Sequence, residues 1–131
     1  STPIPNISTH NSENIYQATT FLKRDEESRL QNYLPKGCKF ARWCDYGVDI
    51  ISAEGGKVEG IKFFCNFYGI EQNEIMAFGD AENDIDMIKY AHIGVAMGNA
   101  QDNVKKVSDY VTSDIDENGI KNAIQFFNIL S

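Results

Sequence analysis

The sequence predicts an α/β protein in which helices cover a parallel β-sheet. From Lys57 onwards, short apolar runs of strand length alternate with segments whose apolar residues recur at helical spacing. The 131 residues include 42% hydrophobic side chains, which is enough for one modest core. Glycine, asparagine and aspartate follow the predicted strands, at the ends where parallel sheets bind their ligands.

The first part of the chain differs from this alternating pattern. Residues 1–14 are rich in Ser, Thr, Asn and Pro without periodicity, which predicts a linker or an irregular segment. The next forty residues, 15–54, predict a strand, a short charged helix that ends at Pro35, and a β-hairpin. These elements are expected at residues 15–21, 25–34, 39–43 and 48–52.

Residues 55–131 predict the parallel sheet and its helices. Val58, Ile61 and Tyr68 share one helical face, and Gly69 is expected to end that helix as its C-terminal cap. After this helix, strands and helices alternate at residues 75–78, 83–90, 93–97, 101–107, 110–112 and 119–129. Such alternation favours a parallel sheet, because parallel strands need a crossover helix between them.

Charge and composition disfavour several classes of function. A formal net charge of −7, with twelve basic residues that form no run, argues against a nucleic-acid or anionic-membrane surface. No apolar stretch approaches the roughly 20 residues of a membrane span, and the polar start does not resemble a signal peptide. The three cysteines follow no disulfide or zinc pattern, so we expect reduced thiols and a cytoplasmic protein with a small-molecule or metal partner.

The most informative segment is the acidic run at residues 78–87. Four carboxylates within seven positions, directly after an apolar strand, would repel one another unless a cation offset their charge. Mg²⁺ binds through one or two carboxylates, so Asp80 at the strand end and Asp84 one helical turn later suit it. Gly79 supports this interpretation, because glycine lets the backbone bend where a ligand approaches. The alternative is that these acidic residues only cap a helix and face water.

Four segments of the sequence match the pattern of a known family. They are Gly-Lys-Val-Glu-Gly-Ile at 56–61, Gly-Asp-Ala-Glu-Asn-Asp at 79–84, Gly-Val-Ala-Met-Gly-Asn-Ala at 94–100 and Asp-Glu-Asn-Gly-Ile at 116–120. Together they resemble the Cof-type branch of the haloacid dehalogenase superfamily, over essentially the whole chain from Ile15. The resemblance implies a three-layer Rossmann-like core with a mobile α+β cap. Residues 15–54 would then be the second half of the cap, and residues 55–131 the C-terminal part of the core.

The same resemblance implies a Mg²⁺-dependent phosphatase that acts on small phosphorylated metabolites, such as sugar phosphates, through an aspartyl-phosphate intermediate. Lys57 would stabilise the phosphoryl oxygens, and Asp80 would ligate Mg²⁺ directly. Asp84 would complete the metal site, and Asn83 and Gly79 would support it. From the residues alone, a lysine after Gly-Gly at a helix start is more often solvated. Ala81 stands where glycine is common in this branch, which leaves the expected metal site intact.

The nucleophile of this family is the residue that the sequence does not offer. Neither an Asp-x-Asp-Gly-Thr segment nor a Ser or Thr phosphate binder after a preceding strand is found. Asp114 follows a predicted strand but lacks the Gly-Thr that would cradle a phosphate, so it is a poor substitute. We therefore expect a C-terminal fragment that is inactive alone and lacks the N-terminal half of its own protein. Unpaired strand edges would favour self-association.

Substrate selection is expected in the cap-like residues 15–54. Arg42 and Trp43 would present a cation and an aromatic face to a sugar phosphate. The alternative for Trp43 is a place in the core, which is the commoner fate of an aromatic residue in a strand.

Two functions of other classes fit parts of the sequence. Residues 114–119 match the first half of an EF-hand calcium loop, but Gln125 stands where that loop needs a bidentate glutamate and Lys121 where an apolar residue is usual. A non-catalytic regulatory domain that kept the fold would be expected to lose Asp80 and Asp84, which are both present.

Overall fold

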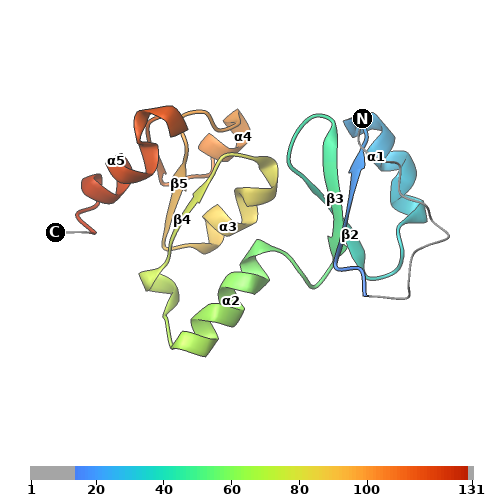
Figure 1. Ribbon diagram of the computed structural model, residues 1–131, viewed down its shortest axis with the longest axis horizontal. Coiled ribbons are helices and arrows are strands. Elements are labelled where there is room, and N and C mark those ends of the chain that lie inside the picture. The colour runs from blue at the N-terminus through green and yellow to red at the C-terminus, as the bar shows by residue number, and fades with distance from the viewer. Residues whose placement is uncertain (1–13, 130–131) are drawn as a thin grey trace.

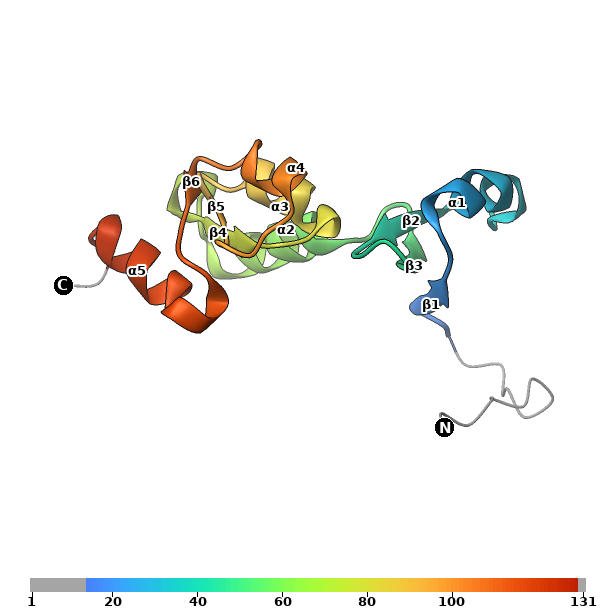
Figure 2. The same cartoon turned by 90° about the horizontal axis from the view of Figure 1, so that it is seen from above.

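Two three-stranded β-sheets, one antiparallel and one parallel, organise the chain (Figure 1). A computed structural model of the protein describes residues 14–129, so the predicted linker 1–14 lies outside the described residues apart from Asn14. We call residues 17–52 the sheet A lobe and residues 57–129 the sheet B lobe. The chain connects them through residues 53–56, and the two lobes lie end to end (Figure 2).

The sheet A lobe contains one helix on an antiparallel sheet of order β1-β3-β2. Its elements are β1 (Gln17–Phe21), α1 (Arg24–Leu30), the 3₁₀ turn η2 (Gln31–Tyr33), β2 (Cys38–Arg42) and β3 (Gly47–Ser52). Three acidic residues in the first turn of α1 complement the positive end of the helix dipole. The predicted helix 25–34 is therefore present but shorter, because its last turn tightens into η2.

The strand registers decide which side chains of sheet A face the other lobe. Gln17 of β1 lies opposite Ile51 of β3, which in turn lies opposite Lys39 of β2. Because side chains alternate along a strand, these three share one face, and all three line the cleft described below. The opposite face carries Val48, which is fully buried.

The sheet B lobe alternates helices and strands, as the sequence predicts. Its elements are α2 (Lys57–Tyr68), η3 (Gln72–Glu74), β4 (Met76–Gly79), η4 (Glu82–Asp84), α3 (Ile85–Tyr90), β5 (Ile93–Ala96), α4 (Asp102–Lys105), β6 (Tyr110–Val111), η5 (Ile115–Glu117) and α5 (Gly119–Phe126). Both strand pairs are parallel, in the order β4-β5-β6. The predicted α/β class is confirmed, although the helices expected at 83–90, 101–107 and 119–129 are all shorter than their patterns suggest.

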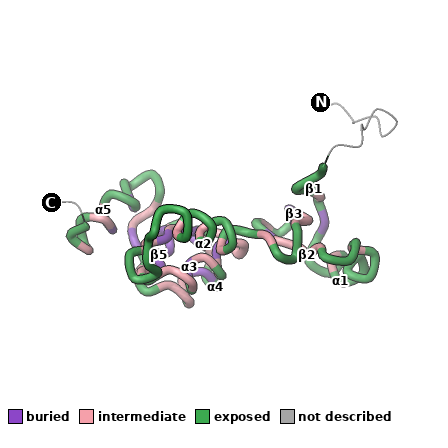
Figure 3. The backbone as a smooth tube through the Cα atoms, turned by 90° about the horizontal axis from the view of Figure 1, so that it is seen from below, coloured by how far each residue is buried: buried purple, intermediate pink, exposed green. Residues whose placement is uncertain are grey.

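The core of the sheet B lobe lies under α3 and α4. Its buried members come from these helices and from β5 and the loop after it: Ile88, Ala96, Met97, Ala100 and Val104. Figure 3 shows the buried part of the lobe gathered around β5. The part of the chain that the structure describes contains no helix long and apolar enough to cross a bilayer.

Helix α2 is packed differently, because none of its residues is buried. Its four aromatic side chains are 57–69% exposed and stack on one another: Phe63, Phe64, Phe67 and Tyr68. Gly69 ends the helix as expected, with a left-handed φ of 70° and its N–H bonded to the carbonyl of Cys65.

Candidate active site

A cleft of about 1250 Å³ separates the two lobes. One wall is the polar face of sheet A, including Lys39 and Asp49, and the other is formed by the start of α2, by η4 and by α3. Lys57, Glu82 and Asn83 line this second wall. The lysine and the acidic loop, far apart in the sequence, therefore meet at one side of the cleft.

Lys57 and Asp84 form an ion pair at the end of β4. Lys57 is the first residue of α2, and its Nζ contacts Oδ1 of Asp84 directly. The Asp84 side chain is only 6% exposed, whereas 48% of the Lys57 side chain remains exposed. The buried carboxylate thus holds a lysine whose ammonium group still reaches solvent.

The second oxygen of Asp84 holds the turn that follows β4. Its Oδ2 accepts hydrogen bonds from the backbone N–H groups of Asp80 at 3.1 Å and Ala81 at 3.2 Å. Both oxygens of Asp84 are therefore engaged by protein donors. Asp84 therefore supports the lysine and the loop, and its expected place in the metal site stays a prediction.

Gly79 makes room for this carboxylate. A Cβ atom on Gly79 would lie 2.5 Å from Cβ and 2.9 Å from Cγ of Asp84, which is closer than real contacts allow. Gly79 has no left-handed φ, unlike Gly37, Gly56 and Gly69. The requirement that the structure shows at Gly79 is therefore one for space, and it does not involve a left-handed backbone.

Asp80 is the exposed carboxylate of the loop. Its backbone carbonyl accepts a hydrogen bond from the N–H of Gln101 at 3.0 Å, which fixes the main chain. Among residues 14–129, no donor bonds to the Asp80 carboxylate, and no group of three or more His, Cys, Asp or Glu side chains gathers tightly enough to hold a metal ion. One oxygen ligand at Asp80 still fits Mg²⁺, because this ion keeps several waters and binds few protein carboxylates.

The carboxyl ends of all three parallel strands converge beside the acidic loop. The N–H of Met97 donates to the carbonyl of Gly79, and the N–H of Gly98 donates to the carbonyl of Ser113, both at 3.0 Å. Asp114 caps η5 by accepting from the N–H of Asp116. Strand β6 precedes this turn where an EF-hand would need a helix, so the geometry does not fit the calcium-loop alternative.

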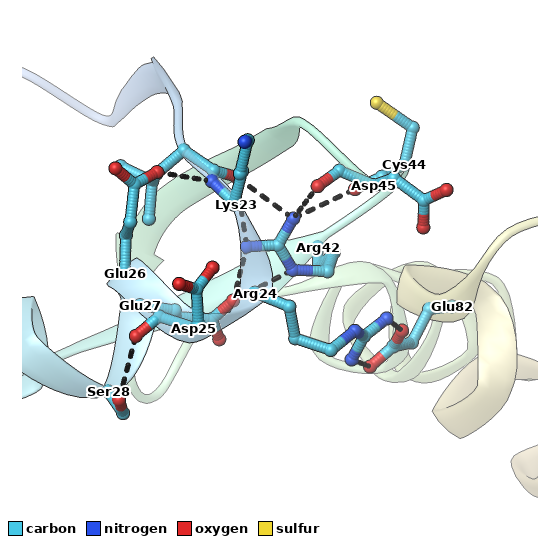
Figure 4. Close-up of polar contacts among 11 residues, drawn as sticks. Lys23, Arg24, Asp25, Glu26, Glu27, Ser28, Arg42, Cys44, Asp45 and Glu82 are labelled. Atoms are coloured by element: carbon cyan, nitrogen blue, oxygen red, sulfur yellow. Dashed lines mark hydrogen bonds and ion pairs between the residues drawn. The ribbon is translucent and has the colours of Figure 1, made fainter.

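Arg42 lies at the cleft wall, but its hydrogen-bond donors point into its own lobe. Its side chain is 3% exposed and bonds to the Glu27 carboxylate at 2.6 and 2.8 Å. The remaining donors reach the carbonyls of Leu22, Cys44 and Asp45 at 2.9–3.3 Å (Figure 4). All of its donors are thus taken within the sheet A lobe, and its role toward a substrate stays a prediction.

Trp43 lies at the hairpin between β2 and β3. A Cβ atom on Gly47 would lie 2.4–2.8 Å from the indole ring, so the ring packs directly on this glycine. Trp43 is nevertheless 36% exposed, so the structure does not place it in the core. The three cysteines are all free and half-buried.

One residue near the site carried no signal in the sequence. Arg24, the first residue of α1, bonds to Glu82 of the acidic loop through two hydrogen bonds of 3.2 and 2.5 Å. The bond from Arg24 lowers the pKa of the Glu82 carboxyl, against burial, which raises it, while the charges of Arg24 and Arg42 lower it further. Fifty-eight residues separate the partners, so no local pattern could predict the pair.

The chain is similar to known proteins in sequence. Residues 2–124 match the sequence profile of the haloacid dehalogenase-like hydrolases. An uncharacterized Geobacillus stearothermophilus protein is 40% identical over 92 residues, covering 70% of this chain and 97% of that protein. The Bacillus subtilis protein YkrA, provisionally named a phosphatase, is 36% identical over 116 residues, covering 88% of this chain and 44% of that protein.

A solved structure also resembles this chain closely. It is that of a HAD subclass IIB sugar phosphatase, which is 39% identical and superposes with a TM-score of 0.84. The match covers 90% of this chain and 45% of the sugar phosphatase. The chain thus spans less than half the length of YkrA and of this structure.

Proposed function

This chain belongs to the family of haloacid dehalogenase-like hydrolases, and from that premise we propose that it supplies part of the active site of a Mg²⁺-dependent phosphatase. The proposed substrates are small phosphate esters, such as sugar phosphates, because a related structure is that of a sugar phosphatase. We propose a cytoplasmic location, since all three cysteines are free thiols.

The observation that carries this proposal is the Lys57–Asp84 pair beside the exposed carboxylate of Asp80. Lys57 would bind the phosphoryl oxygens, and Asp84 would orient it through their ion pair. Asp80 would hold Mg²⁺, with Asn83 at the cleft wall in support. When bound, the ion supplies positive charge to the phosphoryl group.

The proposed reaction passes through an aspartyl-phosphate. An aspartate oxygen attacks phosphorus while the bond to the alcohol oxygen breaks, and water then releases inorganic phosphate from the intermediate. The 131 residues contain no Asp-x-Asp-Gly-Thr segment, so the attacking carboxylate would come from outside this sequence. Asp114 is not a substitute in this proposal, because its carboxylate caps η5.

The domain assignment follows the same proposal. Residues 15–54 would form half of a cap, and residues 55–131 the C-terminal part of the hydrolase core. Within residues 14–129, β4 is paired only with β5, and α2 exposes its aromatic face. We propose that the segment bearing the nucleophile covers this surface, as unpaired strand edges and large apolar patches usually have a partner.

Metal binding tests the proposed role of Asp80. Titration with Mg²⁺ should shift the amide resonances of residues 79–84 at millimolar concentration, and Asp80→Asn should abolish the response. Asp114→Asn, which removes an acid at a neighbouring strand end, should leave the response intact. Unshifted loop resonances in the wild-type chain would exclude the metal site.

Reconstitution tests the proposed reaction. The chain alone should hydrolyse no aryl phosphate at a useful rate, because nothing in it attacks phosphorus. Addition of a segment that carries the Asp-x-Asp-Gly-Thr motif, in trans or by fusion, should restore Mg²⁺-dependent turnover. In that protein Lys57→Ala and Asp80→Ala should each lower turnover steeply, whereas Asp114→Ala should change it little. Turnover by the isolated chain that Asp114→Ala destroys would make Asp114 the nucleophile.

Association tests the proposed covering of α2. Without the nucleophile-bearing segment, two copies of the chain should associate through α2 and the free edge of β4. Light scattering should then report a mass above the 14.7 kDa of one chain. Phe67→Lys should reduce this mass, whereas Tyr33→Lys, at an exposed aromatic residue of the other lobe, should not.

A further inference from the structure

The two lobes touch each other through few groups. Strand β2 contacts the turn η4, and the chain passes between the lobes at residues 53–56. Among the described residues, Arg24 and Glu82 form the one side-chain hydrogen-bonded pair that joins the sheet A lobe to the sheet B lobe. The relative position of the lobes therefore depends on a small contact area and one ion pair.

This ion pair has the geometry that makes arginine contacts strong. Nη1 of Arg24 donates to Oε1 of Glu82 at 3.2 Å, and Nη2 donates to Oε2 at 2.5 Å. Two parallel bonds fix the orientation of both side chains as well as their distance. Figure 4 shows the Arg24 side chain extended from α1 to Glu82 across the boundary between the lobes.

Arg24 and Glu82 lie where a small movement of one lobe would displace the residues of the candidate site. Arg24 begins α1, and Glu82 begins η4, two residues after Asp80 and two before Asp84. The connection between the lobes contains Gly55 and Gly56, and Gly56 adopts a φ of 127°. Such residues absorb the backbone rotation of a hinge.

We propose that Arg24 and Glu82 form an ion-pair latch, which holds the sheet A lobe against the acidic loop and makes Arg24 a positioning residue for residues 80–84. The latch is a property of the lobes themselves and does not require the phosphatase function. With the pair intact, the cleft is closed on the side of η4, and without it the lobes separate about the glycine hinge.

The expected effect is modest because the pair is exposed. The Arg24 side chain is 62% exposed and that of Glu82 is 30% exposed. Exposed ion pairs change an equilibrium by roughly two- to five-fold and weaken as salt rises. A change of this size is visible in the shape of the molecule because few other contacts oppose the opening.

Charge exchange is the experiment that tests the latch. X-ray scattering, extrapolated to zero protein concentration, measures the radius of gyration at low and high NaCl, and loop amide resonances of residues 80–84 are recorded under the same conditions. Wild-type protein should expand with salt. Arg24→Glu and Glu82→Arg should each be expanded already at low salt, with shifted loop resonances and little response to salt. The double variant with both exchanges should regain the compact, salt-sensitive form.

Arg29→Glu is the matched control. Arg29 lies on the same helix, and its substitution makes the same change in net charge without touching the other lobe. Equal expansion of Arg29→Glu and Arg24→Glu would assign the effect to net charge and overturn the latch. Arg24→Glu with wild-type dimensions and unshifted loop resonances at low salt would overturn it as well, as would failure of the double variant to become compact.

Discussion

Each lobe buries one charged side chain, and the two lobes satisfy that charge in opposite ways. The Arg42 side chain in the sheet A lobe is 3% exposed, and the Asp84 side chain in the sheet B lobe is 6% exposed. Arg42 bonds to Glu27 and to three carbonyl groups of its own lobe. Asp84 bonds to two backbone N–H groups and to Lys57, whose side chain is 48% exposed at the cleft.

This difference indicates which of two buried charged side chains has a role in the candidate site. A buried charge must be paired wherever it occurs, so burial by itself does not distinguish a structural role from a catalytic one. The distinguishing property is the partner. All partners of Arg42 lie inside its own lobe. The partner of Asp84 is Lys57, whose ammonium group still has donors exposed to the cleft. Substitution should therefore affect stability at Arg42 and the site at Asp84.

Arg42→Leu should have the largest effect on stability. It leaves the Glu27 carboxylate and the carbonyls of Leu22, Cys44 and Asp45 without their donor, and breaking a buried pair in this way costs about 3–5 kcal/mol. Trp43 is the only tryptophan and lies beside this cluster, so its fluorescence reports urea unfolding of the sheet A lobe. Arg29→Leu, on exposed α1, should change the midpoint little. An unchanged urea midpoint in Arg42→Leu would show that Arg42 does not stabilise the sheet A lobe.

Gly79→Ala should destabilise the sheet B lobe by about 1–3 kcal/mol, because overpacking a tight site costs this much. The added methyl group would overlap Asp84 and approach Cδ1 of Ile88 at 3.0 Å. Gly60→Ala is a matched control, since a Cβ there meets nothing within 4 Å and alanine favours the interior of α2. Hydrogen exchange of β4 and β5 amides should rise in the first variant and not in the second.

Asp84→Asn should disturb the candidate site while leaving the sheet A lobe folded. The amide keeps the size of the side chain but loses the negative charge that pairs with Lys57 and one of the two acceptor oxygens, at a cost of about 1–2 kcal/mol. The resonances of Lys57 and of residues 80–81 should shift, while Trp43 fluorescence should report an unchanged sheet A lobe. Asp86→Asn, at an exposed neighbouring carboxylate, should shift neither set.

The smallest effect should be the pH dependence of the contact between the lobes. Arg24 holds the pKa of Glu82 below its usual value of 4.5, so the folded, closed form releases this proton more readily than the unfolded chain does. The contribution of the pair is therefore fully present above pH 4.5 and is lost as pH falls through the lowered pKa. Scattering should show expansion only below about pH 4.5, and Glu82→Gln should remove that transition.

The sequence predicts most strongly what is local along the chain. The alternation of strands and helices and the loop at residues 79–84 are local patterns, and the structure places Asp80 and Asp84 at the end of β4 as expected. The roles of Arg24 and Arg42 are not local. Arg42 meets a carbonyl 20 residues away, and Arg24 meets a carboxylate 58 residues away, so neither contact has a periodic signature. The sequence also does not predict why residue 79 must be glycine. Its side-chain space is taken by Asp84, which is next to it only once the turn is folded.

The passage of the chain between the lobes at residues 53–56 has a consequence for how such proteins diversify. Within residues 14–129, one short peptide, the contact of β2 with η4 and one ion pair connect the two lobes, so few groups constrain which sheet A lobe is attached. A graft of residues 17–52 from a relative would place its C-terminal junction in residues 53–56, before α2. Position 24 and the β2 residues that contact η4 would have to remain compatible with the acidic loop. Mutations at cleft-facing residues of β1 and β3 can therefore accumulate with little constraint from the acidic loop.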